Sequence, residues 1–248
     1  MTYLLGCDLS SYNPVSDWDL LRSKCSFLVT RASKGSTGVD SAFQTIWDGA
    51  KQHNFLRGAY HLFIPKVSAK DQADNLLKIV KDRPDIPFVV DAELPANLND
   101  LRWGVCSPLE ITNCVWDILT RIEQKTARIP ELYSRADWIN TWLLPIKDWS
   151  HFGLHVARYG TTLPWWEGDH YKPKYWDEWD FWQFQADSVK DGHAYGLGCD
   201  AIDLDYWQGT EDELKVWCGL QPVQVPPVTL EDRVARLEIE ARARGWPV

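Results

Sequence analysis

The sequence predicts an α/β barrel in which eight strands close on themselves and some of the outer helices are missing. Apolar, strand-like runs alternate with runs of helical periodicity, which is typical of a parallel sheet covered by helices. Helices separate the first five or so strands, whereas the later connections are rich in Gly, Pro and Trp and look irregular. The length of 248 residues suits one such barrel.

The expected strands are short, and several of them end in an acid. They cover residues 3–8, 26–32, 57–63, 87–93, 131–134, 155–159, 181–184 and 201–205. Between them we expect helices from residue 17, around residues 43–50, over about 71–81 and over about 108–126. Ser107 and Pro108 open the last of these as N-cap and first helical residue.

The pattern changes after Gly209, which predicts three parts: a barrel domain over residues 1–219, a stiff Pro-rich linker over 220–228 and a C-terminal helix over 229–248. Leucine, valine and alanine residues in that helix follow the 4-3-4 spacing of a coiled-coil seam. Two heptads alone are marginal, so two interpretations stay open. The helix either folds back on the barrel or joins two copies into a homo-oligomer.

The composition excludes several classes of function. A net charge of −9 and a pI near 5.1 argue against a nucleic-acid partner, because binding phosphates requires a basic surface. The sequence contains no run of about eighteen apolar residues, the length that a membrane-spanning helix requires. The six cysteines form no C-x-x-C pair, and no ligand spacing requires a metal, so we expect no metal and no cofactor. Counting alone leaves the disulfide state open.

An acid pair ends the fourth expected strand. Side chains alternate along a strand, so Asp91 and Glu93 emerge on one face, roughly 6.6–6.8 Å apart at Cα. The alternative is a strand end that simply reaches solvent. Asp8 and Asp203 also stand at the expected C-terminal ends of strands, which form the active face of such barrels. We therefore expect Asp8, Asp91, Glu93 and Asp203 to meet in one pocket.

This arrangement suits the hydrolysis of a glycosidic bond, which requires a protonated acid and a second carboxylate. Crowding and burial should raise the pKa of at least one carboxyl. Glu93 is the expected acid because its side chain is longer, and Asp91 is expected to stay ionised. The spacing leaves a retaining and an inverting outcome open. Asp205 shares a face with Asp203 or ends the strand in solvent, and His61 is expected to pack behind its strand.

Six motifs occur in order over about residues 3–209. They are Gly6-Cys7-Asp8-Leu9-Ser10, Gly58-Ala59-Tyr60-His61-Leu62-Phe63, Val89-Val90-Asp91-Ala92-Glu93, Ala157-Arg158-Tyr159, Phe181-Trp182-Gln183-Phe184 and Ile202-Asp203-Leu204-Asp205. Together they resemble glycoside hydrolase family 25, the lysozymes or N-acetylmuramidases found among fungal and bacterial secreted enzymes and phage endolysins. One departure is His155, which stands where the family usually has Trp.

The resemblance implies a modified barrel of eight strands and about five helices. It further implies a peptidoglycan hydrolase that cleaves the β-1,4 bond between N-acetylmuramic acid and N-acetylglucosamine. The quartet Asp8, Asp91, Glu93 and Asp203 would be catalytic, with Glu93 as the proton donor. In the implied route Asp91 assists attack by the substrate's own N-acetyl group. Four further residues match positions that line the family's groove: Tyr60, Tyr133, Tyr159 and Gln183.

Two rival interpretations remain: a wall-binding or phage structural protein that lost turnover, and a hydrolase of chitin or another N-acetylated glycan. The site of action implied by the resemblance is the bacterial cell wall. Residues 1–6 lack the features of a signal peptide, so we expect release by phage lysis, carriage on a virion or non-classical export. Among the 15 tryptophans, Trp165, Trp166, Trp176, Trp179 and Trp182 crowd one segment, where exposed rings would suit sugar faces.

Overall fold

The structure is a computed structural model that describes residues 2–93, 106–160, 172–186 and 191–220. Apart from Leu220, the expected linker and C-terminal helix lie outside the described residues, as do Trp165 and Trp166. No helix in the described ranges is both long and apolar enough to span a lipid bilayer.

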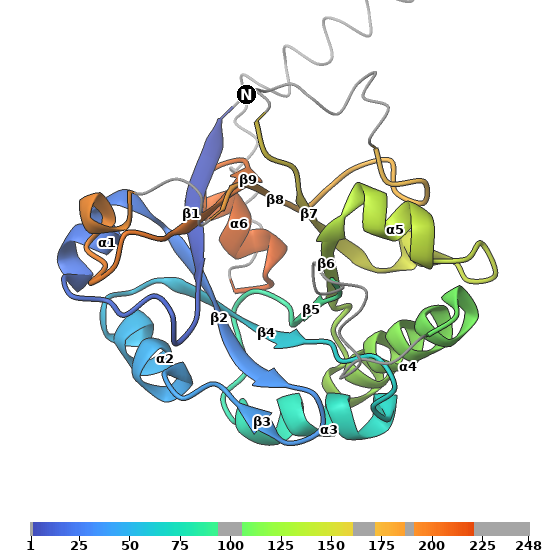
Figure 1. Cartoon of the computed structure of the whole chain (residues 1–248). Helices are drawn as coiled ribbons and strands as arrows, with labels where there is room; N and C mark the ends of the chain where they lie inside the picture. The colour runs from blue at the N-terminus through green and yellow to red at the C-terminus, as the bar shows by residue number, and fades with distance from the viewer. Residues whose placement is uncertain (1, 94–105, 161–171, 187–190, 221–248) are drawn as a thin grey trace, which may run out of the picture.

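Eight strands form a closed barrel, as the sequence predicts (Figure 1). They are β1 (Tyr3–Leu9), β2 (Phe27–Lys34), β4 (Leu56–Leu62), β5 (Val89–Asp91), β6 (Glu131–Arg135), β7 (Gly153–Ala157), β8 (Phe181–Gln185) and β9 (Asp203–Gln208). Pairing of β1 with both β9 and β2 closes the ring, and the two-residue β3 (Gly38–Val39) adds a hairpin to the edge of β2.

The last strand runs against its neighbours. The other strand pairs of the ring are parallel, but β9 is antiparallel to both β8 and β1. The expectation that Asp203 ends a parallel strand is therefore wrong, because Asp203 begins β9. Since β9 is reversed, its first residue lies at the same mouth as the last residues of the parallel strands, and Asp203 pairs with Asp8 across the sheet.

Six α-helices surround the barrel in the described ranges. They are α1 (Trp18–Lys24), α2 (Phe43–Gln52), α3 (Ala69–Ile79), α4 (Pro108–Thr126), α5 (Ala136–Trp142) and α6 (Glu211–Trp217). Ser107 and Glu110 form a capping box that starts α4, where the sequence predicts a start. The described parts of the β7–β8 and β8–β9 connections hold no α-helix, in line with the expected irregular segments.

An apolar plug fills the barrel at the end away from the mouth. It is a cluster of buried side chains that includes Phe27, Phe181, Trp207 and Leu214, and Leu214 comes from α6. The rings of Phe27 and Phe181 meet edge to face at 5.2 Å. Because this end is packed, polar ligands enter the barrel from the other end.

A second apolar layer lies between the sheet and its helices. It contains tryptophans whose rings were expected to be exposed and to contact sugars. Trp176 and Trp182 are 5% and 1% exposed in this layer, and Trp179 packs against it. The indole Nε1 atoms of Trp176 and Trp182 donate to the carbonyls of Phe152 and Arg158 at 2.7 and 2.8 Å. The expectation of exposed rings is therefore wrong for these two residues, because each indole has both apolar contacts and a buried acceptor.

Gly6 makes the plug possible. It pairs with Phe27 in the β1–β2 register, and a Cβ at this position would lie 2.2 Å from the Phe27 ring. Gly6→Ala is expected to lower the free energy of unfolding by about 1–3 kcal/mol, because the added methyl overpacks the barrel. Urea unfolding followed by fluorescence measures the change. Gly198→Ala is the control, since its Cβ would meet no atom closer than 3.5 Å; equal losses in both variants would contradict the account of the plug.

Candidate active site

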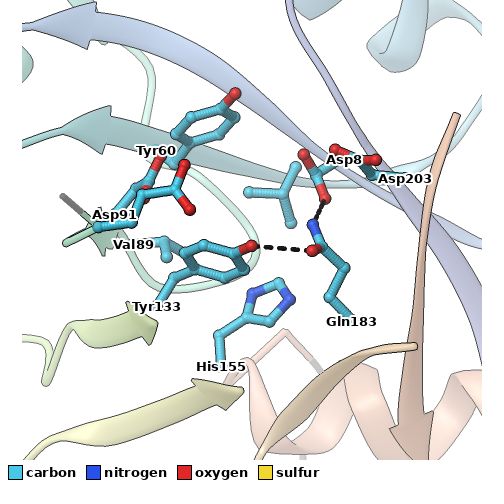
Figure 2. A pocket seen from close by; sticks show the side chains of 10 residues that line it. Asp8, Tyr60, Val89, Asp91, Tyr133, His155, Gln183 and Asp203 are labelled. Atoms are coloured by element: carbon cyan, nitrogen blue, oxygen red, sulfur yellow. Dashed lines mark hydrogen bonds between the residues drawn. The ribbon is translucent and has the colours of Figure 1, made fainter. Parts of the chain in front are cut away.

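A cavity of about 80 Å³ opens at the mouth of the barrel (Figure 2). All four predicted acids line it, together with three of the four predicted groove residues. The lining residues are Asp8, Val29, Tyr60, Val89, Asp91, Glu93, Tyr133, His155, Gln183 and Asp203. The fourth predicted groove residue, Tyr159, is 40% exposed and joins the site through a hydrogen bond to Gln183. The expected convergence of distant residues on one mouth is therefore present.

Strand β5 carries the acid pair to the mouth. Asp91 is its last residue, and its backbone carbonyl accepts from the Phe63 amide at 2.9 Å. Ala92 donates to the Tyr133 carbonyl at 3.0 Å, which holds the chain beyond the strand. Asp91 is 8% exposed, whereas Glu93 lies at the exposed rim. A strand end that simply reaches solvent does not describe Asp91, because its side chain is buried.

Burial and mutual repulsion raise the pKa values of the carboxyls. The pKa of Asp91 lies well above its usual value, first because of burial and then because of Glu93 and Asp203, while Arg31 opposes the shift. Burial also raises the pKa of Glu93, against the pull of Arg135. Both pKa values shift in the same direction and the two carboxyls titrate as a pair, so a protonated Glu93 beside an ionised Asp91 stays a prediction.

Asp8 belongs to a hydrogen-bonded chain at the opposite side of the mouth. The Tyr133 hydroxyl donates to Gln183 Oε1 at 2.8 Å, and the Tyr159 hydroxyl donates to the same oxygen. With its oxygen occupied by two donors, the Gln183 amide turns its Nε2 toward Asp8 Oδ2 at 2.6 Å. Gln183 lines the cavity, as the resemblance implies, but it is only 3% exposed, and its amide holds Asp8 in a fixed orientation.

The surroundings of Asp8 and of the tyrosines disfavour their ionised forms. Burial, followed by the charges of Asp203 and Asp205, raises the pKa of Asp8, and the Gln183 hydrogen bond opposes the rise. Burial, followed by nearby charges, also raises the pKa values of Tyr60 and Tyr133. Both phenols therefore remain hydroxyl donors at neutral pH.

A histidine–aspartate pair that the sequence pattern does not predict lies directly behind the acids. His155 Nε2 is 2.8 Å from Asp205 Oδ1, and both side chains are buried. The alternative that Asp205 ends its strand in solvent is wrong. A signal was present, because Asp205 follows Asp203 at the strand period of two, but nothing in the sequence pairs it with a residue on β7.

His61 lies behind its strand, as predicted. Its Nδ1 is 2.7 Å from Ser33 Oγ, and its Nε2 is 3.2 Å from Gln72 Oε1. Burial lowers its pKa to about 4, so the ring is neutral at physiological pH. The six cysteines are free thiols. Within the ranges that the structure describes, no three His, Cys, Asp or Glu side chains gather in a metal-binding arrangement.

Comparison with known proteins assigns the family. The family model described as glycosyl hydrolases family 25 matches residues 7–193. The uncharacterized protein YegX of Escherichia coli (strain K12) is 28% identical over 219 residues, which are 86% of this chain and 72% of that protein. The N,O-diacetylmuramidase of Arthroderma benhamiae is 27% identical over 210 residues, 79% of this chain and 84% of that protein.

Among solved structures, the muramidase from Acremonium alcalophilum aligns with a TM-score of 0.72 and 24% identity, covering 88% of this chain and 100% of that one. This likeness shows a shared barrel fold. The family match extends over most of the chain, from within β1 into the connection before β9. The chain therefore belongs to glycosyl hydrolase family 25 and is a glycoside hydrolase.

Proposed function

We propose that this enzyme is a muramidase that hydrolyses the β-1,4 bond between N-acetylmuramic acid and N-acetylglucosamine in bacterial peptidoglycan. The observation that carries the proposal is the gathering of Asp8, Asp91, Glu93 and Asp203 around one cavity at the barrel mouth. Family membership and the similarity to a named N,O-diacetylmuramidase support this choice over chitin.

Glu93 is the proton donor in this proposal. It lies at the rim, where the leaving sugar's oxygen would pass, and its raised pKa favours the protonated form. The proton moves from the Glu93 carboxyl to the glycosidic oxygen as the bond from that oxygen to the anomeric carbon breaks. Glu93 is then a carboxylate and takes a proton from the water that completes hydrolysis.

Asp91 assists the nucleophile. The carbonyl oxygen of the substrate's own N-acetyl group attacks the anomeric carbon, and Asp91 accepts a hydrogen bond from the N–H of that group. A hydrogen bond to the ionised form lowers a carboxyl's pKa, so bound substrate offsets the burial that raises the pKa of Asp91. Water then opens the cyclic intermediate with net retention of configuration.

The opposite side of the mouth supports the charge that develops on the sugar ring. Asp8 and Asp203 face each other across the β1–β9 pair, and Gln183 fixes the orientation of Asp8. Negative carboxylates here favour an oxocarbenium-like transition state. The Tyr60 hydroxyl is a donor toward sugar oxygens, whereas the Tyr133 hydroxyl already donates to Gln183 and offers the sugar only its oxygen as an acceptor.

Glu93→Gln tests the acid. Removing a general acid typically costs about 10²–10⁴-fold in rate, so we expect a loss in that range with little change in binding. Clearance of a purified peptidoglycan suspension measures the rate, with chitin as the comparison substrate. Glu178→Gln, the same chemical change at an exposed site, should behave as wild type. A wild-type protein that binds walls without clearing them supports the structural-protein alternative, and faster cleavage of chitin supports the other.

Asp91→Asn tests the N-acetyl route. We expect a fall in kcat of about 10²-fold or more, since the amide cannot supply the negative charge that the cyclic intermediate needs. Peptidoglycan with its N-acetyl groups removed should be an equally poor substrate for the wild-type enzyme. Muropeptide analysis of the digests reports both the bond cleaved and the configuration. Mass spectrometry that detects a glycosyl group attached to Asp91 would contradict this route.

We expect the buried carboxyls of the site to lower the free energy of unfolding as the pH rises. Asp8 has a raised pKa in the folded protein, so the unfolded chain releases that proton first and stability falls above its ordinary pKa. Asp8→Asn removes this loss while its side-chain oxygen still accepts from Gln183. We expect the variant to gain more thermal stability at pH 8 than at pH 4, and calorimetry at both values measures the difference. A gain that is the same at both pH values would contradict the linkage.

A further inference from the structure

The His155–Asp205 pair lies one layer below the catalytic mouth. On β9, Asp205 comes two residues after Asp203, which places it about 7 Å deeper in the barrel. It pairs in register with Gly6 on β1 and with Gln183 on β8. His155 lies between the rings of Tyr133 and Phe181, at centroid distances of 5.2 and 5.4 Å. The pair therefore separates the acids above from the apolar plug below.

The pair is nearly isolated from other partners. His155 and Asp205 are 2% and 0% exposed. Within the described residues, His155 Nδ1 and Asp205 Oδ2 have no hydrogen-bond partner. The imidazole also lines the cavity, where Figure 2 shows it between Tyr133 and Gln183. A net charge on the pair therefore acts on the acids at the mouth with little screening by water.

The groups around the pair are mostly acidic. These are Asp8 on β1, Asp91 on β5, Glu131 and the Tyr133 hydroxyl on β6, Asp203 on β9 itself, and Asp180, which precedes β8. The cations that act on this set are Arg31 at Asp91, Arg135 at Glu93 and Arg128 at Glu131. An Asp205 carboxylate paired with a neutral imidazole would add a buried negative charge to a site that already repels such charge.

We propose that His155 and Asp205 form a pair of zero net charge, in which His155 Nδ1 carries a hydrogen, and that His155 is thereby a positioning residue for the catalytic acids. The extra proton on the pair cancels the charge of Asp205. Asp205 raises the pKa of Asp8 when it acts as a negative charge, so cancelling it lets the carboxyls above ionise at lower pH. The pair thus sets the lower pH limit of the enzyme.

Two variants, one that changes the net charge of the pair and one that restores it, test whether the wild-type pair is neutral. His155→Gln places an amide N–H near the position of Nε2, which keeps the hydrogen bond to Asp205 but removes the positive charge. The pair then carries a net charge of −1, and the acid limb of the kcat/KM profile should move up by roughly one pH unit. The double variant His155→Gln/Asp205→Asn restores zero net charge with a similar hydrogen bond. Its acid limb should return to the wild-type position.

The alternative outcomes overturn the proposal. If the wild-type pair already carries a charge of −1, His155→Gln leaves the limb in place and the double variant moves it down. If the pair serves packing alone, both variants lower kcat/KM by the same factor at every pH. If His155→Gln alone does not fold, the double variant still reports the charge of the wild-type pair, because its two amides bury no charge.

One readout is independent of activity. The activity profiles rest on the proposed muramidase function, whereas ¹⁵N NMR of the full chain does not. We expect His155 Nδ1 to carry a hydrogen between pH 5 and 8. His61 is the internal control, since burial lowers its pKa to about 4 and its ring keeps one unprotonated nitrogen over the same range. An unprotonated Nδ1 on His155 overturns the proposal even if the enzyme proves to cleave another glycan.

Discussion

The barrel holds several carboxyls together at its mouth, and the repulsion among them dominates the electrostatics of the site. Three strands deliver these groups, with β1 and β9 placing Asp8 opposite Asp203 and β5 placing Asp91 across from them. The backbone pairing of the closed ring prevents the strands from moving apart to relieve the repulsion. The remaining way to lower the free energy is to bind protons, and a site that binds protons tightly is suited to general acid catalysis.

The apolar plug intensifies this effect. Phe27, Phe181 and Trp207 exclude water from the barrel beneath the acids, so their carboxyls are solvated only from the mouth. Polar side chains take over part of that solvation: Gln183 supports Asp8, and His155 supports Asp205. Gln183 in turn accepts hydrogen bonds from two tyrosine hydroxyls, and His155 packs against two aromatic rings. The geometry of the mouth thus depends on side chains that a bound sugar need not touch.

Much of this was readable from the sequence, for identifiable reasons. Alternation along a short strand placed Asp91 and Glu93 together, and the motifs in order gave the barrel. The direction of β9 was not readable, because parallel and antiparallel strands show the same alternation of side chains. The link from Gln183 to Asp8 and the His155–Asp205 pair join residues 175 and 50 positions apart, so only the folded chain shows them. The prediction of exposed rings was wrong for Trp176 and Trp182, because the clustering of tryptophans in a sequence does not show whether each indole faces the core or the solvent.

The reversed direction of β9 also decides where the polypeptide departs. A ring of eight parallel strands would release its last strand at the mouth, beside incoming substrate. Here the chain runs from Asp203 down to Gln208 and continues into α6, whose Leu214 seals the floor of the barrel. Leu220, the last residue that the structure describes, therefore lies on the side of the barrel remote from the mouth. The described chain that follows β9 therefore leaves the entrance to the four carboxyls open.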